Sequence, residues 1–429
     1  MTTNVATALI GVGDMWIVGQ LGDAPTQGAV DIGARLFALL FVVMNFLKTG
    51  TTGLVAQAST RSGSGEATSV LLRGVVVAIS IAALLLALKP ILLPFLLDAL
   101  GADGEVLTAA RTYAEIRYWS APAVLVNFAL VGFLVGQRRM TIVLVIEVAY
   151  NLLNVGLGAY LALRLDLGIA GIGWSSASAE LVKLIALSVV LARVTRRADS
   201  PSPLSLADLA PTRFIPFLAV NRDLFLRTVV LMLALAALTR LSAERGAVVL
   251  AANGIFYQLF LVIALLLDGF ENAGQVLNGE RAGARDRLGF AATAREVTIR
   301  SLWLGAGLSV VFLLAGGTVA AWFAATSQVA AYAQEHAIWL AIIPLVGAVG
   351  FALDGVLVGA SWTRALLGVM LLTAIAFAAS LWATWSLGND GLWLSFCVFL
   401  GLRGLAQAII VRQRTRDEKV WQRHTAALI

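Results

Sequence analysis

Charge is scarce in this chain, and so are the residues that build disulfides and metal centres. Charged residues fill 13% of the 429 positions, whereas soluble domains carry about 25%. The single cysteine, Cys397, lies in an apolar run and excludes a disulfide within the chain. Two histidines, His336 and His424, are too few for a histidine metal centre. We therefore expect no metal and no other cofactor.

Apolar residues are what the chain has in excess. Hydrophobic residues make up 59% of the sequence, and the mean hydropathy is +0.88. Such an excess over the whole length is typical of a polytopic membrane protein. The formal net charge of +6 does not indicate a nucleic-acid partner, because the basic residues stand mostly in short loops between apolar runs. Membrane topology explains basic loops of this kind.

Apolar windows of about 20 residues, the length that spans a bilayer, recur along the chain and predict an all-α fold of about twelve transmembrane helices. The predicted helices are 1–21, 28–58, 68–97, 107–137, 140–164, 168–195, 214–241, 246–280, 291–323, 329–360, 364–386 and 390–412. The first one starts at Met1 and barely reaches spanning length. We therefore expect that the natural start lies upstream or that the chain is truncated.

The loops between these helices alternate in charge. Basic loops such as "GQRRM" and "RVTRRADSPSP" alternate with acidic or mixed ones such as "DALGADGE" and "GND". The positive-inside rule places the basic set in the cytoplasm. Both termini are then cytoplasmic, as an even number of spans requires. The expected location is the plasma membrane, which in a bacterium is the inner membrane.

Two halves of the sequence resemble each other across a polar linker. "GFLVG" at 132–136 returns as "GVLVG" at 355–359, and "LGIAGIGWS" at 167–175 returns as "LGNDGLWLS" at 387–395. Offsets near 220 predict two pseudo-symmetric six-helix lobes, and an even helix number gives both lobes the same orientation. Two such lobes around a central site are a transporter architecture, and we expect a monomer. The predicted parts are the N-terminal lobe 1–196, the linker 197–213, the C-terminal lobe 214–415 and the tail 416–429.

A polar stripe interrupts the apolar helix predicted at 246–280. Asp268, Glu271, Asn272 and Gln275 are spaced to share one helix face. Asp268 stands about 16 Å from the helix end, near the bilayer midplane. A carboxylate there needs a partner or a water-filled cavity. We interpret the stripe as part of a substrate cavity between the lobes. The alternative is a structural ion pair with Lys48, which falls beside the position that matches Asp268.

Other polar residues also fall within the predicted helices. Asp14 is the one charged residue of the first helix, and Asn154 and Asp354 stand in later apolar runs. Ionisable residues within spans usually pair or line a pathway. Several more are expected to pair with one another: Arg35, Arg117, Glu147, Glu180, Lys183, Arg227 and Arg240.

Six segments of the sequence resemble one known family over nearly the whole chain. They are "GDMWIVGQLG", "GAVDIGARLFALLF", "GTTGLVAQA", "YAEIRYWSAPAVLVNFALVGFLVGQRR", "LDGFENAGQVLNGERAGARDR" and "FALDGVLVGA". They resemble the multidrug and toxic compound extrusion (MATE) family, and its DinF-like branch in particular. The resemblance implies a twelve-helix antiporter of two lobes. Such an antiporter exports cationic or amphipathic compounds in exchange for H⁺ or Na⁺.

The resemblance also implies roles for individual residues. Asp14 matches the aspartate that couples cation flow in the N-terminal lobe, and Asn154 matches a second polar position there. The family often has an aspartate at the position of Gly158, and the branch commonly has a glutamate where this chain has Gln275. Here the nearest acid is Glu271, one turn earlier on the same face. One buried acid without the second favours H⁺, because Na⁺ prefers several oxygen ligands. The substrate-cavity residues expected are Lys48, Asp268, Glu271, Asn272, Gln275 and Asp354.

Three other functions compete with this interpretation. A flippase for a lipid-linked precursor would need a cavity lined by basic residues. The charged residues expected in the cavity are mostly acids, with Lys48 as the exception. A membrane enzyme would need clustered loop carboxylates or histidines, which the short basic loops lack. An inactive relative would explain Gly158 and the short first helix.

Overall fold

The computed structural model describes residues 17, 24–61, 64–196, 209–418 and 421, and in these residues the secondary structure is helical throughout. The chain forms two compact units, Thr2–Phe214 and Ile215–Ile429. We call them the N-lobe and the C-lobe and describe each by itself. Asp14 lies outside the described residues.

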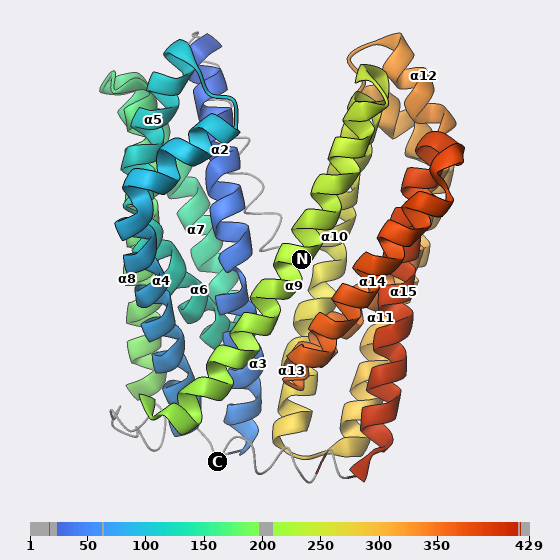
Figure 1. Cartoon of the computed structure of the whole chain (residues 1–429). Helices are drawn as coiled ribbons and strands as arrows, with labels where there is room; N and C mark the ends of the chain where they lie inside the picture. The colour runs from blue at the N-terminus through green and yellow to red at the C-terminus, as the bar shows by residue number, and fades with distance from the viewer. Residues whose placement is uncertain (1–16, 18–23, 62–63, 197–208, 419–420, 422–429) are drawn as a thin grey trace. The chain divides into compact units, whose positions relative to one another are not determined.

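The N-lobe is a bundle of helices around one central helix, α6 (Figure 1). Its elements are α2 (Ala24–Met44), α3 (Phe46–Arg61), α4 (Ser64–Ala99), α5 (Gly104–Tyr118), α6 (Ala121–Gly136), α7 (Met140–Ala159), a π-helical turn (Tyr160–Arg164) and α8 (Gly168–Arg196). Helix α6 packs on α3, α4 and α8. Helices α5 and α6 are bent by 51° at the break between them, where proline stands in the first turn of α6. Proline is favoured there because the first turn needs no backbone donor.

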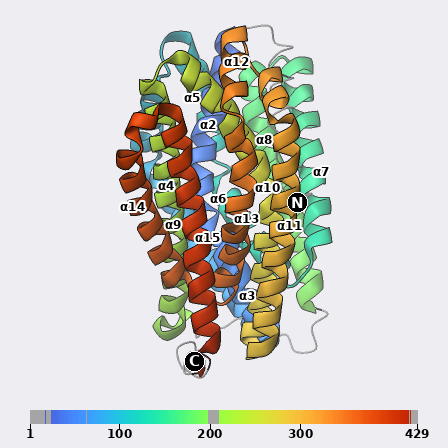
Figure 2. The ribbon, with the colours of Figure 1, turned by 90° about the vertical axis from the view of Figure 1, so that its right-hand side faces the viewer.

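The C-lobe repeats this plan around α13 (Figure 2). Its elements are α9 (Pro211–Glu244), α10 (Ala247–Gly283), α11 (Arg287–Trp322), α12 (Ser327–Glu335), α13 (Ile338–Gly359), α14 (Thr363–Ala383), a 3₁₀ turn (Trp385–Leu387) and α15 (Gly388–Arg416). Helix α13 packs on α10, α11 and α15. The buried core of this lobe contains Phe256, Phe260, Trp393 and Phe396. The Phe396 ring packs edge to face with Phe260 and Trp393, and the Phe256 ring is tilted against Trp393.

The predicted membrane fold is confirmed. Among the described residues nine helices are long and apolar enough to cross a bilayer, and the bent pair α5–α6 makes a tenth span. Helix α8, at 29 residues, is also longer than the ~20 residues that a span needs. The first predicted helix lies almost wholly outside the described residues. The chain is thus an integral membrane protein with a helix order consistent with twelve spans.

The internal repeat is regular in the structure. Helices α5 and α12 begin at Gly104 and Ser327, and α7 and α14 begin at Met140 and Thr363, an offset of 223 residues in both cases. Helices α8 and α15 begin at Gly168 and Gly388, an offset of 220. The offset changes after α7 in the N-lobe and after α14 in the C-lobe. At this point the N-lobe has its π-helical turn and the C-lobe has its 3₁₀ turn.

Even irregular backbone geometry recurs at this offset. Arg138 and Ser361 end their helices with positive φ angles of 59° and 56°. The next amide closes each helix with the same hydrogen bond, from Arg139 N to Leu134 O and from Trp362 N to Leu357 O, both 2.8 Å long. This left-handed closure usually requires glycine or asparagine. Its conservation at equivalent turns supports descent of the two lobes from one ancestral unit.

Candidate functional site

In each lobe the central helix crosses a neighbouring helix in close backbone contact. A Cβ atom at Gly355 of α13 would overlap the carbonyl of Glu271 in α10, and one at Gly359 would lie 2.5 Å from the carbonyl oxygen of Gln275. In the N-lobe a Cβ at Gly132 of α6 would lie 2.6 Å from the carbonyl oxygen of Lys48 in α3. Only glycine fits such crossings, as in other small-residue contacts between membrane helices.

These contacts fix the register of the two polar faces and correct one expectation. Gly132 and Gly355 are 223 residues apart, and so are the residues they touch, Lys48 and Glu271. Lys48 is therefore the counterpart of Glu271, whereas the sequence placed it beside the position that matches Asp268. The counterpart of Asp268 is Asn45, which interrupts the helix between α2 and α3. The error arose because the motifs compared had offsets that differ by three residues.

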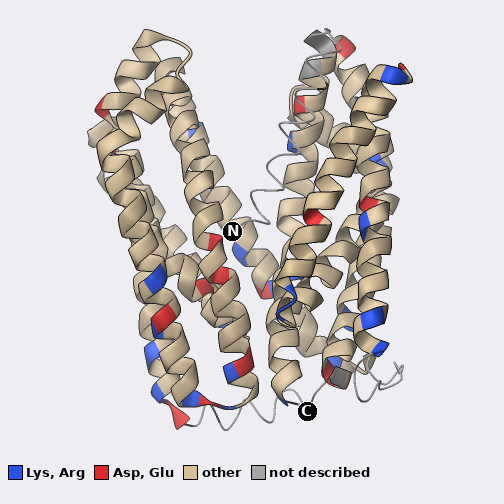
Figure 3. Cartoon of the chain, turned by 180° about the vertical axis from the view of Figure 1, so that it is seen from behind, with Lys and Arg blue, Asp and Glu red and all other residues tan. Residues whose placement is uncertain are grey.

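With the register corrected, equivalent faces of the two lobes carry opposite charge. The face on α3 presents Lys48 at the place where the face on α10 presents Glu271. Asp268, Glu271 and Asn272 are half-buried, and Gln275 is buried. The Asn272 amide donates a hydrogen bond of 2.8 Å to the Asp268 carbonyl oxygen. Figure 3 shows acidic and basic positions within the helices as well as at their ends.

Asn154 lies in the N-lobe core between α7 and α8. It is 1% exposed and accepts hydrogen bonds from the Ser175 and Ser176 hydroxyls at 3.1 and 3.4 Å. Ile17 of the first predicted helix reaches the same place. A Cβ at Gly158 would lie 3.0 Å from Ile17 Cδ1 and 3.1 Å from Ser175 Oγ. Gly158 therefore leaves only tight space where the family often has an aspartate.

A second polar cluster lies deeper along α8. The Glu180 carboxylate accepts hydrogen bonds from Asn127 Nδ2 at 2.9 Å and from the Tyr150 hydroxyl at 2.7 Å. One turn away, Lys183 pairs with Glu147 at 2.8 Å and also lies over the Tyr150 ring. The pairing expected between Glu147 and Lys183 is thus found. These groups link α6, α7 and α8, and each of the buried charges has a partner, as burial requires.

Asp354 lies within the C-lobe bundle and is fully buried. Its carboxylate is bound by the guanidinium groups of Arg227 from α9 and Arg403 from α15, and by the Gln407 amide. The three charged side chains sum to a net charge of +1, and Arg227 Nε is left without a hydrogen-bond partner among the described residues. This setting favours an intralobe ion network for Asp354 over the substrate cavity that the sequence suggested.

Sequence reasoning missed Arg403, Gln407, Asn127, Tyr150 and the serines beside Asn154. Arg403 and Gln407 are four residues apart in α15 and share one face with Asp354 as their target. An arginine and a glutamine at helical spacing in an apolar run were the available signal. The serines gave no signal, because serine is common in transmembrane helices whatever its role.

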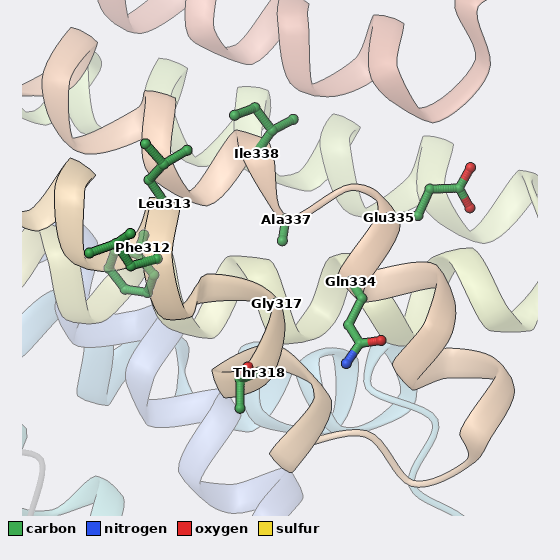
Figure 4. Close-up of a pocket in the computed structure, with 9 residues that line it drawn as sticks. Phe312, Leu313, Gly317, Thr318, Gln334, Glu335, Ala337 and Ile338 are labelled. Atoms are coloured by element: carbon green, nitrogen blue, oxygen red, sulfur yellow. The ribbon is translucent and has the colours of Figure 1, made fainter.

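One small cavity lies at the end of the C-lobe where α11 meets α12 and α13. Its volume is about 400 Å³, and Phe312, Leu313 and Ile338 line it together with Gln334. Figure 4 shows Gln334 and Thr318 on the side of the cavity opposite Ile338, and the Glu335 carboxylate directed away from it. The cavity lies at a helix end far in sequence from the α10 stripe, so we assign it no part in the candidate site.

Two homologous lobes with polar residues buried in membrane helices define an integral membrane transporter, and the comparisons with known proteins say which kind. The model of the MatE family matches residues 1–160 and 224–381. The chain therefore belongs to the MatE family of membrane transporters and is not an enzyme.

Two bacterial relatives match nearly its whole length. DNA damage-inducible protein F of Escherichia coli K12 is 32% identical over 97% of this chain and 90% of its own. A probable multidrug resistance protein NorM of Agrobacterium fabrum is 27% identical over 93% of this chain and 88% of its own. These matches confirm the family and the DinF-like branch that the sequence motifs indicated.

Solved structures share the fold. A MATE crystal structure in the bent conformation superposes with a TM-score of 0.89 and 16% sequence identity, covering 99% of this chain and 95% of that one. An outward-facing multidrug resistance MATE family transporter gives 0.85 at 17% identity, covering 97% and 93%.

Proposed function

We propose that this protein is a secondary antiporter that exports cationic or amphipathic small molecules in exchange for protons. Membership of the MatE family supports export, since its relatives include a protein named for multidrug resistance. Proton coupling is supported by one observation above the others. The N-lobe polar core around Asn154 has neutral hydroxyl partners, and Gly158 stands where a second carboxylate would help to balance the charge of a bound Na⁺.

Asp14 is the proposed coupling residue, with Asn154 as a neutral hydrogen-bonding partner in the same lobe. A carboxylate in an apolar helix favours its protonated form more than one in water does. Uptake of a proton would remove the charge of Asp14 and shift the conformational equilibrium of the first helix. Alternating access then links proton entry to substrate release. We propose the plasma membrane as its location, both termini in the cytoplasm, and a monomer as the working unit.

The acids of α10 are the proposed recognition groups for a cationic substrate. Asp268 and Glu271 are half-buried, so each is partly desolvated yet reachable by water. A partly desolvated carboxylate attracts a cation more strongly than one in bulk water. The flippase alternative, which needs a basic cavity, would draw on Lys48 and Arg35. Retained transport after both are changed to glutamine would contradict it.

Transport in proteoliposomes tests the proposal. The release of a fluorescent lipophilic cation is followed after a pH gradient is imposed, and separately after a Na⁺ gradient. Efflux driven by the pH gradient is expected in the wild type. It should fall by about tenfold or more in Asp14→Asn, since acid–base coupling groups contribute effects of this size or larger.

Asp31→Asn is the matched control, because Asp31 is in the same lobe but half-exposed and paired with Arg35 at 3.0 Å. It should keep the wild-type rate. Equal pH-driven export by Asp14→Asn and wild type would rule out the coupling role of Asp14. Efflux driven by the Na⁺ gradient and not by the pH gradient would mean that the coupling ion is Na⁺.

A further inference from the structure

A groove lies on the C-lobe between α11 and α15, well apart in sequence from the α10 stripe. Its volume is about 540 Å³. Its floor is apolar, with Ala294, Leu353 and Val411 all buried. Every residue that lines it belongs to the C-lobe, so the groove is complete within that unit.

Three exposed arginines line this apolar groove. Arg295 comes from α11, and Arg412 and Arg416 come from α15. The lining contains no carboxylate. Within the part of the chain that the structure describes, no ion pair or hydrogen bond engages these three guanidinium groups. Three unneutralised cations thus converge on one apolar floor.

Other arginines of α10 and α11 are neutralised. Arg281 pairs with Asp286 at 2.7 Å, Arg287 with Glu418 at 3.3 Å and Arg300 with Glu296 at 2.5 Å. The lack of acid partners is therefore specific to the groove and is not a general property of this basic surface. Side chains that keep five donors and a full charge suit a phosphate group, which guanidinium binds in bidentate fashion.

The groove extends from a helix end into the membrane-spanning body of the lobe. The Arg287–Glu418 pair and the contact of the Phe290 and Trp421 rings, 5.2 Å apart, show that α11 begins where α15 ends. From Arg416 to Ala408 the α15 axis advances by ~12 Å. The headgroup layer of one leaflet is only about 5–7 Å thick. Arg412 and Arg416 thus lie near headgroup depth, while the groove floor reaches hydrocarbon depth. Arg295, eight residues along α11, is level with the floor, and its long side chain has to extend toward the headgroups.

We propose that this groove binds an anionic glycerophospholipid of the cytoplasmic leaflet. The lipid phosphate contacts Arg295, Arg412 and Arg416, and one acyl chain follows the floor formed by Ala294, Leu353 and Val411. Basic pockets between helices on the cytoplasmic side are suited to anionic headgroups. A zwitterionic lipid would leave the three cations without compensating charge, and a free phosphate would leave the apolar floor uncovered.

The bound lipid would hold three helices of the C-lobe together. Arg295 belongs to α11, Leu353 to α13, and Arg412 to α15. Leu353 directly precedes Asp354, whose ion network joins the same α13 and α15. Occupancy of the groove should therefore raise the thermal stability of the protein, whatever compound it transports.

Native mass spectrometry of the purified full chain tests this proposal. Phosphatidylglycerol or phosphatidylcholine is added to the protein in detergent, and the fraction of protein that carries a lipid is measured. We expect the wild type to retain phosphatidylglycerol about tenfold more strongly than phosphatidylcholine. The triple variant Arg295→Gln, Arg412→Gln, Arg416→Gln should lose this preference. Melting temperature and gel filtration report whether each variant is folded.

Two further variants make the test specific. The control triple variant Arg281→Gln, Arg287→Gln, Arg300→Gln removes the same charge from the same lobe and should keep the preference. Ala408 of α15 also lines the groove. Ala408→Phe fills the apolar part of the groove but retains all three groove arginines, and it should lose the lipid. An excess of glycerol 3-phosphate should not displace the lipid from the wild type.

Each opposite result would overturn the proposal. Equal loss in the control triple variant would mean that overall surface charge retains the lipid. Full binding by the groove triple variant or by Ala408→Phe would place the lipid elsewhere. Displacement by glycerol 3-phosphate would make the groove a site for a free phosphate compound and not for a lipid.

Discussion

Asp354 illustrates how far one buried residue can be understood from its partners. A single carboxylate is surrounded by two guanidinium groups, from Arg227 and Arg403, and all three side chains are largely or fully buried. Removing one partner of a buried ion pair leaves an uncompensated charge, which costs about 3–5 kcal/mol. Because one acid is bound by two bases, substitution of Asp354 should destabilise the fold more than substitution of either arginine.

We predict that Asp354→Asn destabilises the fold far more than Arg403→Met. The first change leaves two buried guanidinium groups without an anion, with an expected loss near ~4 kcal/mol. The second leaves Asp354 paired with Arg227 and lowers the buried net charge to zero, so a loss of about 1–2 kcal/mol is expected. Thermal or denaturant unfolding of the purified variants in detergent measures both.

A different outcome would support the earlier assignment of Asp354 to the substrate cavity. An Asp354→Asn protein with the wild-type unfolding midpoint, but without transport, would show that this carboxylate acts on the substrate or on the coupling ion. Arg227→Met serves as a second comparison, because it also leaves one base with one acid.

The contact between α10 and α13 depends on glycines of α13, which leave one face of that helix without side chains. Gly355 and Gly359 stand one turn apart on α13 and bring it against the α10 backbone beneath Glu271 and Gln275. The polar stripe of α10 is therefore positioned by its neighbour and not by its own sequence alone. The same arrangement of Gly132 and Gly136 holds α6 against α3.

We predict that Gly355→Ala separates these helices and Gly347→Ala does not. A Cβ at Gly355 overlaps backbone, which cannot rotate away, so a loss of about 2–3 kcal/mol and of most transport is expected. A Cβ at Gly347 of the same helix meets the Phe351 ring at an ordinary 3.7 Å. Alanine there should be neutral or stabilise the helix by up to ~1 kcal/mol. Unfolding midpoints of both variants check this, and equal midpoints would contradict it.

Periodicity alone was enough to predict the helices but not their register. The apolar runs gave every described span, because length and hydropathy are properties of the segment itself. The break at Asn45 and the division of 329–360 into α12 and α13 were not predicted, since both depend on packing against neighbours. Likewise the Asp354 network needed three helices in place before Arg403 could be recognised as a partner.

The two lobes together show what duplication has kept and what it has changed. The helix order, the glycine contacts and the left-handed helix ends recur in both lobes, the contacts and the helix ends at an offset of 223 residues. Charge at the equivalent polar faces does not, since Lys48 in the N-lobe corresponds to Glu271 in the C-lobe. Packing constraints are shared by both halves of such a fold, whereas recognition requires each half to present its own chemistry. The opposite charges of Lys48 and Glu271 therefore mark the position where function has diverged between the halves.

The two interpretations of the α10 stripe lead to different results when these charges are exchanged. If Glu271 recognises a cationic substrate, Glu271→Lys should reduce export of a lipophilic cation by about tenfold or more, as expected for loss of one partly buried charge contact. Lys48→Glu should have little effect by itself. The double variant, with both charges exchanged, should be as defective as Glu271→Lys.

If Lys48 and Glu271 instead form a structural ion pair, each single variant should be impaired, and the double variant should regain much of the lost activity. Such rescue is the signature of a direct interaction between two sites. Proteoliposome efflux measured for the two single variants and the double variant decides between these cases. Thr49→Asn with Asn272→Thr, which exchanges neutral residues at the neighbouring equivalent positions, controls for the effect of altering both faces at once.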